Sequence, residues 1–250
     1  RYVNFFFFTI PKSFHLKGLK IVLDCANGAT YHIAPPLFCD LGADLTVLGV
    51  KPNGLNINKH SGSTHLDTLQ KIVLSEKADL GIAFDGDGDR VLMVDSLGEI
   101  VDGDELLFLL AQRGIKTGHI QGGVVGTAMS NLGLELALNE LGLAFIRTSV
   151  GDRYVNEALQ TKNWQLGGEA SGHIISRRVS KTGDGIIIAL QVLEAIQSSG
   201  LSLHNAKKAM KKFPQILINI AAENPSAIME APSIKKAILL AEKVLMNRGR

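Results

Sequence analysis

Hydrophobic and polar positions follow two alternating patterns along this chain. Short apolar runs rich in β-branched residues are typical of buried strands, and longer stretches with apolar residues every three or four positions are typical of amphipathic helices. Glycines that end helical stretches (Gly42, Gly142, Gly200) and a capping Asp184 set several limits. The pattern predicts strands over 19–25, 44–48, 78–84, 91–94, 123–126, 144–148 and 215–221, and helices over 31–41, 66–75, 105–113, 131–141, 185–199, 202–213 and 233–246.

The pattern of the first half of the chain recurs in the second half. The segment 41–45 (LGADL) and the segment 141–145 (LGLAF) mark the same helix end and strand start. Alternating strands and helices favour sheets covered on both faces, so we expect two homologous three-layer α/β/α modules with mixed sheets and the start of a further domain. The predicted limits are 1–16 for the tail of a preceding domain or a linker, 17–117 and 118–214 for the modules, and 215–250 for the beginning of a truncated C-terminal domain.

An acidic, glycine-rich loop follows the strand at 78–84. Asp85, Asp87 and Asp89 alternate with glycines and are followed by Arg90. Three carboxylates so close together repel each other, and a bound divalent cation reverses that cost. A single Asp-Gly pair would indicate only a hairpin turn. A calcium loop of the EF-hand type fits poorly, because Arg90 stands where its glycine belongs and Ser96 where its glutamate belongs. The loop therefore predicts a Mg²⁺ site on Asp85, Asp87 and Asp89.

A second glycine-rich loop occupies the equivalent place in the second half. Glu169, Ser171 and His173 supply an acceptor, a hydroxyl and an imidazole, a set that can bind vicinal sugar hydroxyls and transfer a proton near neutral pH. The alternative is a structural turn with a structural histidine. At the junction 150–154, Arg153 stands where a helix N-terminus favours anions and could contact a phosphate. Equally, Asp152 could cap that helix and leave Arg153 solvated.

Composition narrows the classes of function. The 250 residues are 46% hydrophobic and 20% charged, which is typical of a globular chain, and the net charge of +2 gives no field that attracts nucleic acid. The lysines at 207, 208, 211 and 212 have the spacing of a solvated helix face. No apolar run approaches 18 residues, which argues against a membrane span. Cys25 and Cys39 fit neither a metal site nor a disulfide framework, and we interpret them as buried residues of a cytoplasmic protein.

The two loops together resemble those of the α-D-phosphohexomutase superfamily. In that superfamily the sequence Asp85–Arg90 corresponds to the metal loop and Gly168–His173 to the sugar loop. Within it, the motifs at 24–30, 150–155 and 182–186 resemble those of the bacterial phosphoglucosamine mutases. Phosphomannomutase/phosphoglucomutase members tend to carry aromatic residues after the sugar-loop histidine, where this chain has Ile174 and Ile175.

The resemblance implies a function. It implies Mg²⁺-dependent interconversion of glucosamine 6-phosphate and glucosamine 1-phosphate through a bisphosphate, toward cell-wall precursors. Glu169, Ser171 and Arg153 would bind substrate, His173 would bind substrate and assist catalysis, and Arg90 would steady the metal loop or a phosphate. A phosphosugar is the expected partner, and a homodimer is a family-level expectation. Alternatives are a phosphomannomutase/phosphoglucomutase and a non-catalytic module that binds metal or sugar phosphate.

Two motifs of the superfamily do not occur in this sequence. One is the phosphoserine motif Thr/Ser-Ala-Ser-His-Asn-Pro, and the other is the phosphate-binding loop Arg/Lys-Ser-Gly-Thr-Glu-Pro. We therefore expect a fragment that is inactive by itself, because the group that carries the phosphoryl in such enzymes is missing from it.

Overall fold

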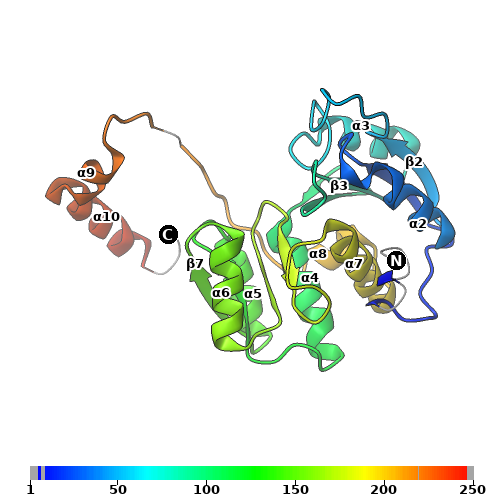
Figure 1. The fold of residues 1–250 in the computed structure, drawn as a ribbon. Coiled ribbons are helices and arrows are strands. Elements are labelled where there is room, and N and C mark those ends of the chain that lie inside the picture. Colours follow the sequence, from blue (N-terminus) through cyan, green and yellow to red (C-terminus); the bar gives the residue numbers. More distant parts are fainter. Residues whose placement is uncertain (1–4, 7–8, 219, 247–250) are drawn as a thin grey trace.

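The structure is a computed structural model that describes residues 5–6, 9–218 and 220–246 (Figure 1). Strands and helices alternate along most of the described chain. In chain order they are β1 Lys20–Asp24, η1 Ala29–His32, α2 Ala34–Asp40, β2 Asp44–Leu48, α3 Asp67–Glu76, β3 Leu80–Phe84, β4 Val91–Asp95, β5 Ile100–Val101, α4 Gly103–Lys116, β6 Gly123–Thr127, α5 Leu132–Glu140, β7 Ala144–Thr148, α6 Asp152–Lys162, β8 Leu166–Gly168, β9 Ile174–Ser176, α7 Gly185–Ser199, α8 Leu203–Lys207, α9 Pro225–Glu230 and α10 Pro232–Leu245.

The strands form two mixed sheets with the same strand order. The first sheet has the order β2-β1-β3-β4-β5 and the second β7-β6-β8-β9. In each sheet the first three strands are parallel and the strand after them is antiparallel. Thus β1, β2, β3 and β4 correspond to β6, β7, β8 and β9. The predicted α/β fold with two similar modules is confirmed.

Both faces of each sheet are buried, as the near-continuous apolar strands predict. In the first sheet, alternate residues of β1 face opposite cores: Val22 packs with Leu69 and Val73 of α3, whereas Ile21 and Leu23 belong to the main core. In the second sheet, Val125, Val155, Leu159 and Ile175 form the small core beneath α6. The main core is continuous between the sheets, which fixes their relative placement.

Two long helices each pack against the sheet of the other module. Helix α4, which follows the first sheet in sequence, contacts β8, α5 and α7 more than it contacts β4. Helix α7, which follows the second sheet, contacts β3 and β4 as well as β9. Figure 1 shows α4 and α7 side by side between the two sheets. Sequence order assigns α4 to the first module, whereas its packing assigns it to the second. The predicted domain limits therefore stay a prediction.

Most of the predicted helix ends are confirmed. Asp184 caps α7 by accepting a hydrogen bond from the Ile187 amide, and Gly200 ends α7 with φ +68°. The predicted helix at 31–41 is split into η1 and α2, since Pro35 and Pro36 favour a new helix start at that point. Of the predicted helix at 202–213, only the part that corresponds to α8 is helical. After α8 the chain turns and continues without regular structure.

The predicted strand at 215–221 is wrong for the residues that the structure describes there. Residues 215–218, 220 and 221 have no strand partner, and Ile216, Leu217, Ile218 and Ile220 are exposed. An apolar β-branched sequence forms a strand only when another strand supplies its hydrogen bonds. Figure 1 shows this segment leading away from the two sheets to α9 and α10. Position 219 lies outside the described residues.

Three smaller findings complete the fold. Cys25 is buried, and burial raises the pKa of its thiol to about 12, but Cys39 is exposed, which corrects the prediction for it. Within the predicted N-terminal tail, Phe6 is fully buried and Phe5 is partly exposed. The remaining aromatic residues of that run, Phe7 and Phe8, lie outside the described residues. None of the described helices has the length and apolarity needed to cross a membrane.

Candidate active site

The two predicted functional loops occupy equivalent positions and meet. The acidic loop connects β3 to β4, and the loop with Glu169, Ser171 and His173 connects β8 to β9. These connections correspond to each other in the two sheets. An isolated antiparallel bridge pairs Arg90 with His173, and the Val91 amide donates to the Gly172 carbonyl over 3.2 Å. The fold thus brings together two loops about eighty residues apart in sequence.

The acidic loop gathers its three aspartates around one point. Asp85 is buried, and one of its oxygens accepts hydrogen bonds from the Gly88 and Arg90 amides at 3.2 and 3.1 Å. One carboxylate oxygen from each of Asp85, Asp87 and Asp89 lies within 4.8 Å of the others. Gly88 has φ +80°, a backbone conformation that favours glycine and bends the loop tightly.

The electrostatics of this loop leave negative charge unbalanced. Burial raises the pKa of Asp85 to about 6, and the neighbouring charges of Asp89 and Asp87 add to this rise. The hydrogen bond that Asp85 accepts from the Arg90 amide opposes it. The half-exposed Arg90 reaches Asp85 and Asp89 with its Nε at 3.8 Å from one oxygen of each. The Asp89 Oδ1 atom is buried and has no hydrogen-bond partner in the part of the chain that the structure describes. A hard divalent cation with oxygen ligands fits this donor set.

Backbone hydrogen bonds within the second loop fix the positions of its glutamate and histidine. The Glu169 amide donates to the His173 carbonyl, and the Gly172 amide donates to the Glu169 carbonyl, both at 3.0 Å. One side-chain oxygen of Glu169 accepts from the Gly151 amide at 2.9 Å, which leaves the other for a ligand. Ser171 is exposed at the tip of the loop. The loop therefore presents a carboxylate and a hydroxyl on a rigid backbone.

His173 joins the two loops through its side chain. Its imidazole is buried, and Nδ1 lies 3.0 Å from Asp89 Oδ2. The carboxylate favours the tautomer with hydrogen on Nδ1, which leaves the Nε2 lone pair free. The imidazole packs against Gly183, where an added Cβ would lie 2.5 Å from His173 Cε1. Gly183 is thus required for the position of the ring.

A supporting loop that the sequence analysis did not assign to the site holds the acidic loop from its other side. The Ala29 amide donates to the Gly86 carbonyl at 2.7 Å, and a Cβ at Gly28 would lie 2.2 Å from that same oxygen. Asp24 ends β1 and accepts from the Ala26 and Gly62 amides at 2.9 and 2.8 Å. An aspartate at the end of a buried strand was the available signal.

The structure does not bring Arg153 into the two loops. Its side chain is 80% exposed and pairs with Glu157 over 2.8 Å, one helical turn away. Asp152 is the first residue of α6 and not its cap, which is Gly151. The junction reaches the second loop through the Gly151 amide instead. Of the predicted site residues, Arg153 is the one whose contacts lie elsewhere.

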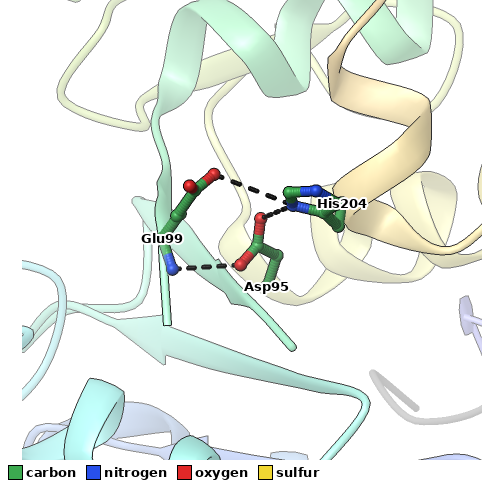
Figure 2. A group of neighbouring side chains, drawn as sticks. All are labelled: Asp95, Glu99 and His204. Carbon is green, nitrogen blue, oxygen red and sulfur yellow. Dashed lines mark hydrogen bonds and ion pairs between the residues drawn. The ribbon is translucent and has the colours of Figure 1, made fainter. Parts of the chain in front are cut away.

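A second acidic cluster lies where the first sheet meets α8 (Figure 2). Asp95 at the end of β4 is fully buried, and its Oδ2 accepts from His204 Nδ1 at 2.8 Å, while Glu99 lies 3.7 Å from the same ring nitrogen. Lys207 is also buried, and its ammonium lies 2.8 Å from both carboxylates. The predicted solvated face is therefore wrong for Lys207.

The second cluster has a buried counter-charge within the chain. Burial by itself raises the pKa of Asp95, but hydrogen bonds from Lys207, His204 and the Glu99 amide outweigh it and hold that pKa below its usual value. The ammonium of Lys207 already occupies the position where a cation would bind both carboxylates. The donor set resembles a metal site, but the geometry is that of a buried ion pair that joins the modules.

Two family models match the chain. One describes the phosphoglucomutase/phosphomannomutase alpha/beta/alpha domain II and matches residues 1–98. The other describes the phosphoglucomutase/phosphomannomutase alpha/beta/alpha domain III and matches residues 102–213. The first match contains the acidic loop, and the second contains the loop with Glu169 and His173.

Curated relatives are similar over the whole chain. A phosphoglucosamine mutase of Pseudomonas aeruginosa (strain LESB58) is 56% identical over 250 residues, and phosphoglucosamine mutase 2 of Shewanella sp. (strain MR-7) is 55% identical over 252 residues. Each alignment covers 100% of this chain and 56% of the relative. The chain thus spans little more than half the length of the relatives it matches.

Solved structures share the fold. A phosphoglucomutase/phosphomannomutase family protein of Burkholderia thailandensis aligns with a TM-score of 0.73 at 26% identity, covering 83% of this chain and 45% of that one. An Aspergillus fumigatus N-acetylphosphoglucosamine mutase, solved with GlcNAc-6P and magnesium, aligns with a TM-score of 0.74 at 22% identity, covering 90% of this chain and 56% of that one. The second likeness concerns the fold alone.

Proposed function

This chain belongs to the phosphoglucomutase/phosphomannomutase family, and on that premise we propose that the protein containing it is a Mg²⁺-dependent phosphosugar mutase. The proposed reaction interconverts glucosamine 6-phosphate and glucosamine 1-phosphate through a sugar 1,6-bisphosphate. The observation that carries the proposal is the contact between the two loops, in which His173 bonds to Asp89 of the acidic loop. The names of the curated relatives support the amino sugar.

The acidic loop is the proposed metal site. Asp85, Asp87 and Asp89 would hold the ion, and the buried Asp89 Oδ1, which has no hydrogen-bond partner among the described residues, is the observation that fits one. Bound Mg²⁺ supplies charge neutralisation for a phosphoryl group in transfer. Arg90 lies beside this loop with a half-exposed guanidinium, and in the proposal it binds a phosphate oxygen or steadies the loop.

The second loop is the proposed sugar site. The free oxygen of Glu169 and the exposed hydroxyl of Ser171 would bind adjacent sugar hydroxyls. Such contacts can hold the sugar in either of two orientations, which an enzyme that moves a phosphate between O1 and O6 requires. His173 would bind the sugar and accept or return a hydroxyl proton at Nε2, because its Nδ1 is bonded to Asp89. Arg153 would contact an outer phosphate after leaving Glu157.

The phosphoryl donor lies outside this sequence in the proposal. The serine motif that donates the phosphoryl group in such enzymes does not occur among the 250 residues. We therefore expect the isolated chain to bind Mg²⁺ and sugar phosphate without turnover. Turnover by the isolated chain would show that another group carries the phosphoryl.

The test is a mutase assay on the full reading frame that contains this chain. It offers the 6-phosphates of glucosamine, glucose and mannose separately, with Mg²⁺ and with a chelator. The proposal predicts Mg²⁺-dependent turnover with glucosamine 6-phosphate preferred. Preference for glucose or mannose phosphate would keep the mechanism and replace the substrate. Binding of sugar phosphate without any turnover would leave the alternative of a non-catalytic module.

A further inference from the structure

A cavity of about 300 Å³ lies at the far end of the second sheet from the candidate active site. Leu166 and Ser176 line it and pair with each other at one end of the β8–β9 hairpin, whereas Gly168 and Ile174 pair at the end that carries the proposed sugar loop. Helices α4 and α7 supply further walls. The cavity is therefore separate from both functional loops, although β8, β9 and α7 lead from it to them.

The wall of the cavity carries more positive than negative charge. Arg113 and Glu194 form a two-pronged ion pair, in which Arg113 Nε lies 2.9 Å from one oxygen of Glu194 and Nη2 lies 2.5 Å from the other. Ser198 donates a further hydrogen bond to Glu194, so both oxygens of this carboxylate are bonded within the chain. The exposed Arg178 also lines the cavity and interacts electrostatically with Glu194, but within the described chain its guanidinium forms no hydrogen bond or close ion pair. Two arginines against one glutamate leave the cavity wall with one net positive charge.

A side-chain amide whose nitrogen has no hydrogen-bond partner among the described residues lies in the same wall. The side-chain nitrogen of Gln191 is buried and has no hydrogen-bond partner within the described residues. A buried amide without a partner costs about 1–3 kcal/mol, so such groups usually have a ligand or water to bind. Rotation of this terminal amide offers either its oxygen or its nitrogen to the cavity. Gln191 and Glu194 both belong to α7, whose first residue donates its amide to the Gly88 carbonyl of the acidic loop.

The remaining wall has an apolar part beside polar residues, which include Thr117, His119 and Gln165. Leu110 and Ile120 line the cavity beside Ile10 from the segment that precedes β1. The volume is at the lower end of the range for pockets that bind small molecules, about 300–1,000 Å³. A guanidinium with free donors selects phosphate or carboxylate groups, and the apolar wall selects a compact organic body.

We propose that this cavity is a second binding site, for a small organic anion, distinct from the phosphosugar site. The anion would bind Arg178 with its charged group and Gln191 with a neighbouring oxygen. Its apolar body would rest on Leu110 and Ile120. The proposal does not depend on mutase activity, because binding at this cavity involves none of the residues assigned to the reaction.

The test uses phenyl phosphate and benzoate as probes, with phenol as the uncharged control. Calorimetric titration is made on the full reading frame, in the presence of saturating glucosamine 6-phosphate to occupy the proposed sugar site. The variants are Arg178→Ala and Gln191→Leu. The matched control is Lys181→Ala, which removes an equal charge from an exposed position three residues along that does not line the cavity.

The proposal predicts saturable binding of at least one anion and none of phenol. Arg178→Ala should weaken that binding at least about tenfold, since it removes a charge-assisted hydrogen bond, and Gln191→Leu should weaken it severalfold. Lys181→Ala should leave it within twofold. Absence of binding by both anions at millimolar concentration, or equal binding by all variants, would overturn the proposal. Thermal unfolding of each variant shows whether the fold is retained.

Discussion

Two acidic clusters in this molecule offer similar ligand atoms, but the chain balances the charge of only one. Asp95 and Glu99 share the ammonium of Lys207, which is buried with them. Among the described residues, the counter-charge near Asp85 and Asp89 is the half-exposed Arg90 at 3.8 Å, and Asp89 also hydrogen-bonds to the His173 imidazole. The comparison teaches that proximity of carboxylates does not define a metal site. Negative charge that the fold leaves without a counter-charge is the better criterion.

The largest expected effect comes from removing the counter-charge of the balanced cluster. Lys207→Met leaves the fully buried Asp95 without its ammonium partner, and loss of one member of a buried pair costs about 3–5 kcal/mol of unfolding free energy. Urea unfolding of the full reading frame measures the change. Adding Asp95→Leu to Lys207→Met should recover most of it, since no buried charge then remains. A single variant as stable as the parent would show that Lys207 is not the balancing charge.

Removing charge from the unbalanced cluster should affect activity instead. Asp87→Asn takes away an exposed proposed ligand and little packing, so we expect unfolding free energy to change little. Loss of a group that only supports a metal ligand lowers metal affinity or activity about 10–100-fold. Loss of the ligand itself should therefore lower mutase kcat/KM by at least about a hundredfold. The matched variant Glu99→Gln, at the exposed acid of the other cluster, should keep kcat/KM within threefold. Equal losses in the two variants would contradict the distinction.

Another buried aspartate, Asp104, extends the comparison to the dependence of stability on pH. Asp104 Oδ2 accepts a hydrogen bond from the Asn131 amide and the Ser130 side chain also acts on this carboxylate, whereas Oδ1 has no hydrogen-bond partner among the described residues. Burial raises its pKa to about 6, whereas the pKa of Asp95 is lowered by its partners. A raised acid pKa means that the folded state holds the proton more tightly, so this group lowers stability as pH rises from about 4 to 6. The lowered pKa of Asp95 has the opposite sign, and its stabilisation is lost as pH falls below about 4.

Asp104→Asn should therefore stabilise the protein above pH 6 by about 1–3 kcal/mol, from a pKa shift of roughly two units. It should have little effect near pH 4, where Asp104 is protonated in the folded state and only about half ionised in the unfolded state. Urea unfolding across pH 4–8 gives the difference curve. A variant that is destabilised equally at every pH would mean that the carboxyl contributes through its hydrogen bond alone.

The smallest effect is expected at Arg153, which lies outside both clusters. Because its side chain is exposed and paired with Glu157, Arg153→Ala should raise KM for the sugar phosphate about three- to tenfold and leave kcat within twofold. Steady-state kinetics on the full reading frame separates the two constants. A fall in kcat at unchanged KM would place Arg153 in the chemical step instead.

Local sequence patterns predicted the parts of the site whose residues are close in sequence. The aspartates at 85, 87 and 89 reach one point because they share a five-residue loop. The repeat also predicted equivalent positions for the two loops, which the strand orders confirm. Helix caps such as Asp184 and Gly200 depend on neighbouring residues and were predicted for the same reason.

Features that depend on distant partners were not predictable in this way. Lys207 has the spacing of a surface lysine, and only the packing of α8 against β4 buries it beside Asp95. The segment 215–221 has strand composition but no described neighbour to pair with. The roles of Gly183 and Gly28 appear only when the atoms opposite them, in His173 and Gly86, are known. Each of these outcomes is decided by tertiary contact and not by local propensity.

A calorimetric Mg²⁺ titration of the full reading frame and of two variants, Asp87→Asn and Glu99→Gln, distinguishes the two acidic clusters. The account predicts one Mg²⁺ site per chain, lost or weakened at least about a hundredfold in Asp87→Asn and unchanged in Glu99→Gln. A site that survives Asp87→Asn but disappears in Glu99→Gln would place the cation at the cluster that contains Lys207, and would contradict the proposed metal site.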